Sequence, residues 1–148
     1  MSDIALITLS NAGARLTEKR AREPGGGAVF LHTDVARRFQ GERFDRVLAL
    51  TRKIFRRYRG LVYVMPCGVV VRAIAGWVRH KTRDPAVVVV DIAGRYAVSL
   101  LSGHEGGANA LALRVANALG AEPVISTSTE ALKDVIVMNE SMRGRFLT

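Results

Sequence analysis

Residues 61–101 decide the fold, and two stretches carry the signal: LVYVMPCGVVVRAI at 61–74 and VVVVDIAGRYAVSLL at 87–101. The first predicts a strand, Leu61–Met65, that turns at Pro66-Cys67-Gly68 into a helix. In the second, the uninterrupted β-branched run Val87–Val90 is typical of a strand buried on both faces of a sheet. Ala93-Gly94 then predicts a turn, and Tyr96–Leu101 predicts a strand close enough to the first to form a hairpin with it.

Strands and helices alternate on both sides of this stretch. Such alternation predicts an α/β fold with an open, mostly parallel sheet flanked by helices and one antiparallel hairpin. Residues 1–148 are expected to form a single domain, with an N-terminal region 1–60 and a core motif region 61–129. The other predicted elements are a strand at Ile4–Leu9, a helix from the N-cap Ser10 to about Arg22, a strand at Ala28–Leu31, an arginine-rich helix at Arg46–Arg59 with Gly60 as its C-cap, a helix at Ala108–Leu119 closed by Gly120, and a last strand at Val124-Ile125.

Composition narrows the class of partner without choosing one. The chain has 22 basic and 13 acidic residues, a formal net charge of +9. This excess favours an anionic partner: nucleic acid, acidic lipid or a polyanionic small molecule. Aromatic residues make up 6% of the chain, few for a surface that stacks the bases of single-stranded nucleic acid. Nucleic acid is therefore not the expected partner, although the arginine-rich helix and a pI of about 10.8 keep that alternative open.

Nothing in the sequence predicts a membrane or a secreted protein. The longest apolar stretches are of strand length, short of the ~20 residues that a bilayer span needs. The N-terminus has no basic region followed by a long apolar run, and the single cysteine, Cys67, excludes an intrachain disulfide. We expect a soluble cytoplasmic protein. Oligomeric state is left open, a homo-oligomer included.

Three segments are predicted to lie at strand ends and to form one positively lined hollow at the carboxyl edge of the sheet, where open α/β sheets bind ligands. Two of these segments are basic. Gly68 permits a tight turn before a helix whose free N–H groups favour anions, and Arg72 follows one helical turn later. Lys81 and Arg83 belong to a basic cluster just before the buried strand that ends at Asp91. The alternative is that the first is a routine strand-to-helix turn and the second a charged connecting loop.

The third segment, SLLSGHEGGANALA at 99–112, is the most informative. A predicted strand runs into a loop whose glycines allow backbone N–H groups to approach a ligand closely. His104 can exchange protons near neutral pH, Glu105 is a candidate base, and Ser102 a candidate donor or weak nucleophile. Asn109 opens the helix and either caps it or binds a ligand. The alternative without a functional role is a flexible loop followed by a helix that Asn109 caps.

Several familiar sites are excluded by spacing. The glycines are spaced Gly-x-x-Gly-Gly, which matches neither the dinucleotide fingerprint nor the P-loop. No G-x-S-x-G elbow supports a serine hydrolase triad. The three histidines and one cysteine show no ligand spacing, so no metal site is predicted.

Taken together, PCGVVVRAI at 66–74, KTRDPAVVVVD at 81–91 and SLLSGHEGGANALA at 99–112 resemble the cobalt-precorrin-5A hydrolase (CbiG) family of anaerobic cobalamin biosynthesis. The resemblance runs from about Leu61 to Thr129, including AEPVISTST at 121–129, and is looser over 4–59. It implies a hydrolase that opens the δ-lactone of a cobalt tetrapyrrole and releases acetaldehyde. The substrate is polyanionic and brings its own cobalt, so no cofactor is expected from the protein.

The resemblance brings no assigned catalytic residues, so their roles are inferred from the reaction. His104, with Glu105, would activate water at the lactone carbonyl, and the N–H groups of Gly106 and Gly107 would stabilise the oxyanion. Arg72, Lys81 and Arg83 would hold substrate carboxylates. The remaining predicted contacts are Gly68, Gly103 and Asn109.

One departure from the family concerns length. Members are commonly about twice as long and carry a further C-terminal domain, which we expect to be absent from this chain. A partner chain is one expected source of the missing part. The main alternative is therefore a non-catalytic tetrapyrrole-binding module, and a second is a basic nucleic-acid-binding domain, which predicts a steep salt dependence.

Overall fold

The computed structural model describes residues 3–104 and 106–127, which form one seven-stranded sheet covered by helices. The strand order is β3-β2-β1-β4-β5-β6-β7. The strands are β1 (Ile4–Thr8), β2 (Ala28–His32), β3 (Glu42–Phe44), β4 (Gly60–Val64), β5 (Ala86–Val90), β6 (Tyr96–Leu101) and β7 (Glu122–Val124). β1 to β5 are parallel, β6 is antiparallel to β5, and β7 is parallel to β6. The predicted α/β fold with one antiparallel hairpin is confirmed.

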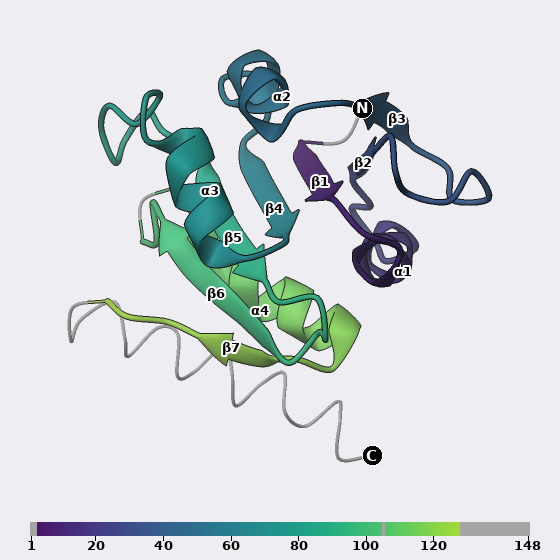
Figure 1. Ribbon diagram of the computed structural model, residues 1–148. Helices are drawn as coiled ribbons and strands as arrows, with labels where there is room; N and C mark the ends of the chain where they lie inside the picture. Colours follow the sequence, from purple (N-terminus) through teal and green to yellow (C-terminus); the bar gives the residue numbers. More distant parts are fainter. Residues whose placement is uncertain (1–2, 105, 128–148) are drawn as a thin grey trace, which may run out of the picture.

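Helices cover both faces of the sheet (Figure 1). α1 (Asn11–Ala21) and α4 (Ala108–Leu119) pack against each other on one face, while α2 (Val47–Ile54) and α3 (Cys67–Ile74) pack against each other on the opposite face. In Figure 1, α3 crosses in front of the sheet and α4 lies behind it. No described helix is long and apolar enough to cross a bilayer.

The central strands divide their side chains between two apolar cores. Leu61, Tyr63 and Met65 belong to the core beneath α2 and α3, whereas Val62 and Val64 belong to the core beneath α4. All five residues of β5 are buried, as the β-branched run predicts. A strand without a polar face is stable only between two covering layers, and this pattern sets the layered architecture.

Helix ends confirm two of the predicted caps. The Ser10 hydroxyl accepts a hydrogen bond of 3.0 Å from the Gly13 N–H, which satisfies one of the free donors at the start of α1. Gly120 has a φ of 70° at the end of α4, a left-handed conformation that glycine adopts without steric strain. The N–H of Ala121 then donates to the carbonyl of Ala116.

The arginine-rich helix is shorter than predicted, and Gly60 is not its C-cap. α2 ends at Ile54, with Phe55 as the capping residue, and Gly60 is the first residue of β4. Phe55 is fully buried, which draws the chain down toward the sheet at this point. A Cβ on Gly60 would lie 2.9 Å from a methyl of Leu111, so glycine here permits the close approach of α4. The predicted arginine face is therefore divided between a helix and a turn.

Two short strands differ from the prediction. β3 was not predicted, because its three residues, two of them charged, show no alternation. It is held in place by Arg43, whose guanidinium donates to the carbonyls of His32, Val35, Ala36 and Phe39. The last strand, β7, covers 122–124 and not Val124-Ile125.

Candidate functional site

The hairpin places the three predicted segments at two different edges of the sheet. We call the ends of β1, β4 and β5 the carboxyl edge and the beginnings of these strands the amino edge. Since β6 runs antiparallel to β5, its end at Leu101 lies beside Val87 at the amino edge. The glycine loop (102–107) follows there, opposite the turn that leads from β4 into α3. Five-residue strands separate the two edges by about 16 Å.

Gly68 and Arg72 lie at the carboxyl edge. Gly68 is the second residue of α3, which begins just after β4 ends. The Nη1 atom of Arg72 lies 3.3 Å from the position a Cβ on Gly68 would occupy, so the guanidinium folds back toward the start of the helix. The prediction that all segments form one hollow at the carboxyl edge is therefore wrong, because the hairpin carries His104 to the other edge.

The Ser102 side chain and backbone are both engaged in holding the glycine loop. Ser102 is buried, and its φ of 59° is the one positive value among the described non-glycine residues. Its carbonyl accepts from the N–H of Ala108 at 3.0 Å, and its hydroxyl donates to the carbonyl of Asp84 at 3.3 Å. Left-handed geometry costs a non-glycine residue about 1–2 kcal/mol, which these bonds offset. The hydroxyl is therefore not poised as a nucleophile.

Internal packing or backbone conformation accounts for each of the three glycines of the loop. A Cβ on Gly106 would collide with the Cβ of Ser102, and one on Gly103 would lie 2.9 Å from Oδ1 of Asn109. Gly107 has open space around it but a φ of 86°, and it is the N-cap of α4. Close contacts within the loop explain Gly103 and Gly106, and the positive φ explains Gly107. The sequence suggested that these glycines serve ligand binding.

The predicted catalytic group is only partly described. His104 is exposed, and Glu105 lies outside the described residues. Among the described contacts, no hydrogen bond joins Ser102 to His104. The assignment of His104 and Glu105 as acid–base groups therefore remains a prediction, and an engaged Ser102 hydroxyl leaves water as the candidate nucleophile.

Asn109 is the most constrained polar residue beside the loop. It is 4% exposed, and its Oδ1 accepts from the Ser99 hydroxyl at 2.7 Å. Its Nδ2 is buried without a hydrogen-bond partner among the described residues. Gly107, not Asn109, is the N-cap of α4, so the capping alternative is wrong.

Lys81 and Arg83 are exposed in the loop before β5, at the same edge as the glycine loop. That loop is organised by Asp84, whose side chain is 1% exposed. Its carboxylate accepts from the N–H of Arg79 at 2.9 and 3.0 Å and from Arg56 at 3.1 Å. Asp84 therefore anchors the start of β5 and supports Ser102, so this segment is more than a plain connection.

A hollow of about 470 Å³ opens at this edge, and we call it the amino-edge hollow. The glycine loop contributes Gly106 and Gly107, and α4 contributes Leu111 and Arg114. The other lining residues are Asp3, Ile4, Gly25, Arg59, Gly60 and Ala86. Arg59 and Arg114 were not predicted as site residues, because only the packing of α4 beside the start of β4 brings them together.

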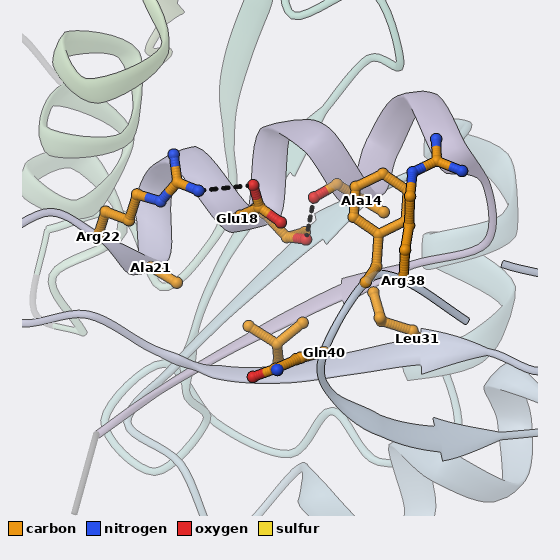
Figure 2. Close-up of a pocket in the computed structure, with 10 residues that line it drawn as sticks. Ala14, Glu18, Ala21, Arg22, Leu31, Arg38 and Gln40 are labelled. Atoms are coloured by element: carbon orange, nitrogen blue, oxygen red, sulfur yellow. Dashed lines mark hydrogen bonds and ion pairs between the residues drawn. The ribbon is translucent and has the colours of Figure 1, made fainter. Parts of the chain in front are cut away.

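Two other hollows are less suited to an anionic ligand. One hollow, of about 440 Å³, lies between α1 and β2 (Figure 2). There Arg22 forms an ion pair with Glu18 at 2.8 Å, and the guanidinium carbon of Arg38 lies 4.6 Å from the centre of the Phe39 ring. The other, of about 500 Å³ at the carboxyl edge, is lined almost entirely by apolar side chains, with Asp91 at its rim. Among the described residues, no three His, Cys, Asp or Glu side chains lie close enough to share a metal ion.

Comparison with known proteins supports a single family. A family profile described as cobalamin synthesis G N-terminal matches residues 49–130. A protein named cobalt-precorrin-5A hydrolase from Priestia megaterium is 35% identical over 146 residues, 91% of this chain and 37% of its own length. One of the same name from Salmonella typhimurium is 49% identical over 88 residues, 59% of this chain and 25% of its own length.

A solved structure shares the fold. The crystal structure of a cobalamin biosynthesis protein G homologue from Sulfolobus solfataricus superimposes with a TM-score of 0.62 over 94% of this chain and 45% of its own. At 23% identity, this likeness concerns the fold alone. The chain thus spans between a quarter and two fifths of the length of the curated relatives that it matches.

Proposed function

Because the chain belongs to the cobalamin synthesis G N-terminal family, we propose that it acts as the N-terminal module of a cobalt-precorrin-5A hydrolase and contacts the tetrapyrrole at the amino-edge hollow. The observation that carries the proposal is the 35% identity with a protein of that name over 91% of this chain. Since that relative is much longer, the proposal concerns one module of the reaction and not the whole enzyme.

The charge at the amino edge supports a polyanionic ligand. Arg59 and Arg114 line the hollow, and Lys81 and Arg83 are exposed at the same edge. A tetrapyrrole with several carboxylates is attracted by such a cluster, and guanidinium groups pair with carboxylates in a bidentate geometry. Arg72 lies at the other edge, so its predicted part in the same site is not included in the proposal.

The reaction implied by the family needs a base and oxyanion donors. Water would add to the lactone carbonyl and the acyl C–O bond would break, which leaves a carboxylate on the macrocycle and an alkoxide on the two-carbon fragment. The alkoxide would then become the carbonyl of acetaldehyde as the C–C bond to the macrocycle breaks, and the electron pair of that bond would stay on the macrocycle. We infer that His104, exposed on the glycine loop, takes the proton from this water. The N–H groups of Gly106 and Gly107, on the same loop and at the hollow, would stabilise the oxyanion.

A binding module without turnover is the second candidate. It is favoured by one observation: Arg59 and Arg114, which can bind anions, line the same hollow. In that case the substrate is held here while other parts of the longer enzyme perform the hydrolysis.

Anaerobic incubation with cobalt-precorrin-5A, followed by product mass and an acetaldehyde assay, separates the two. Acetaldehyde released by the wild type but at least ~100-fold more slowly by His104→Ala supports the catalytic assignment. His80→Ala is the matched control, since His80 is exposed at the same edge and contacts Thr82. Saturable pigment binding without acetaldehyde supports the binding module.

Two results contradict the proposal. An unchanged rate in His104→Ala removes the base assignment. No pigment binding, together with RNA binding that weakens steeply with salt, would support a nucleic-acid-binding domain in place of both tetrapyrrole candidates.

A further inference from the structure

Arg20 is a buried arginine whose guanidinium is only partly satisfied by the protein. It lies in the last turn of α1 and is 3% exposed. Its Nε and Nη1 atoms have no hydrogen-bond partner in the part of the chain that the structure describes. Burial of a charged group without a partner is strongly unfavourable, so a guanidinium in this state points to a missing anion.

Two less buried guanidinium groups behave differently. Arg43 donates to four backbone carbonyls, and Arg56 donates to the Asp84 carboxylate and the carbonyl of Trp77. The fold therefore satisfies arginines whose role is structural. The unpaired state of Arg20 is an exception to this pattern.

The surroundings of Arg20 increase its need for an anion. Burial lowers the pKa of Arg20, the nearby positive charge of Arg114 lowers it further, and Glu23 acts in the opposite direction. Glu23 forms no ion pair with Arg20 within the described residues, and Asp3 is the acidic residue among those that line the hollow. Among the described residues, two guanidinium groups thus lie near each other and no carboxylate forms an ion pair with either of them.

Arg20 borders the amino-edge hollow. Its Nη2 atom lies 3.9 Å from the position a Cβ on Gly25 would occupy, and Gly25 lines the hollow. Arg114 lines the same hollow from α4, which packs against α1. Because Gly25 carries no side chain, only the backbone at this position stands between the lining of the hollow and the Arg20 guanidinium.

We propose that Arg20 and Arg114 form a subsite for one carboxylate of the ligand at the α1–α4 side of the amino-edge hollow. A carboxylate seated there accepts hydrogen bonds from both guanidinium groups and separates their charges. The identification of that carboxylate as part of a tetrapyrrole rests on the proposed function. The subsite itself takes any carboxylate that reaches the hollow.

Uroporphyrin, a tetrapyrrole with carboxylate side chains, is the probe, and its binding is measured by fluorescence titration. Arg114→Gln and Arg20→Met are each expected to weaken binding about 10- to 100-fold, the effect of losing a charge-assisted hydrogen bond. Arg15→Gln, which removes an exposed arginine elsewhere on α1, is the matched control and is expected to bind as the wild type does.

Thermal unfolding distinguishes a binding role from a structural one. Arg20→Met removes an unpaired buried charge, so the ligand-free variant is expected to have an equal or higher Tm than the wild type. A lower Tm with unchanged binding means that Arg20 stabilises the fold, which overturns its place in the subsite. If this variant does not fold, Arg114→Gln decides, since Arg114 is exposed.

Small anions separate the subsite from the proposed function. If the wild type does not bind uroporphyrin but citrate raises its Tm, and this rise is lost in Arg114→Gln, the subsite stands and the tetrapyrrole assignment fails. If inorganic phosphate gives that Arg114-dependent rise and citrate gives none, the carboxylate assignment is overturned. Binding of uroporphyrin and citrate by Arg114→Gln at wild-type strength also overturns it.

Discussion

Replacing Gly103 with alanine tests whether the glycine loop is built for its own packing or for a ligand. The new Cβ would lie 2.9 Å from Oδ1 of Asn109, closer than carbon and oxygen tolerate, and 3.4 Å from Cγ2 of Thr127. Asn109 is 4% exposed and has little room to move. The substitution must therefore displace the buried amide or the loop backbone.

The expected cost follows from these contacts. Overpacking a buried site costs about 1–3 kcal/mol. Displacing Asn109 also breaks its 2.7 Å hydrogen bond with the Ser99 hydroxyl, a loss of about 1 kcal/mol. The sum is about 2–4 kcal/mol, and for a domain of this size it lowers the Tm by roughly 6–12 °C.

Gly107→Ala is the matched control, because a Cβ there meets nothing within 4 Å and the φ of 86° is the only obstacle. The left-handed strain of about 1–2 kcal/mol exceeds the gain from the lower entropy of the unfolded chain, so the expected cost is about 1 kcal/mol. Both variants are compared with the wild type by differential scanning calorimetry and urea unfolding. A Gly103→Ala protein with wild-type stability and weaker ligand binding would refute the packing explanation and restore the ligand role.

Two further predictions concern buried and ionised groups outside the loop. The Tyr63 side chain is fully buried, and burial raises the pKa of its hydroxyl to about 12. Thr51→Val removes the 2.8 Å hydrogen bond of this hydroxyl and is expected to lower the free energy of unfolding, measured in urea, by about 1–3 kcal/mol. Adding Tyr63→Phe is expected to recover much of this loss, and equal instability of the single and double variants would contradict it. Burial raises the pKa of Asp91, but hydrogen bonds from Tyr96 and Arg95 outweigh it, so the net pKa lies below the ordinary aspartate value of about 3.9. The ionised Asp91 therefore stabilises the fold above about pH 4, and this contribution is lost as the pH falls through its lowered pKa. Asp91→Asn is expected to make the free energy of unfolding depend less on pH in the acid range. If the free energies of variant and wild type fall in parallel with pH, the effect is excluded.

Only part of the family motif lies at the amino-edge hollow. The motif residues of the glycine loop do reach a hollow with basic side chains, but the arginines that line it are Arg59 and Arg114. Arg72, which precedes the loop by some 30 residues, lies at the other edge. If the proposed function holds, the ligand is therefore expected at the amino edge, with Arg20 as the buried cation beside the hollow.

Sequence by itself determined the layers of this protein. The run Val87–Val90 cannot have a solvated face, so it requires cover on both sides, and the alternation of strands and helices supplies it. Ser10 and Gly120 mark helix ends because their local chemistry satisfies backbone groups wherever the helix lies. The sequence did not predict features that are short or that depend on tertiary contacts. β3 has only three residues, and α2 ends early because Phe55 is buried.

Only the tertiary structure decided which of these side chains lie together. The sequence already predicted the hairpin, but its consequence, a reversed β6 that ends at the amino edge, depends on the register with β5. Arg20 and Arg114 are 94 positions apart (114 − 20), and no spacing rule connects them. They are brought together because α1 and α4 pack on the same face of the sheet, and an arginine's burial and partners are properties of that packing.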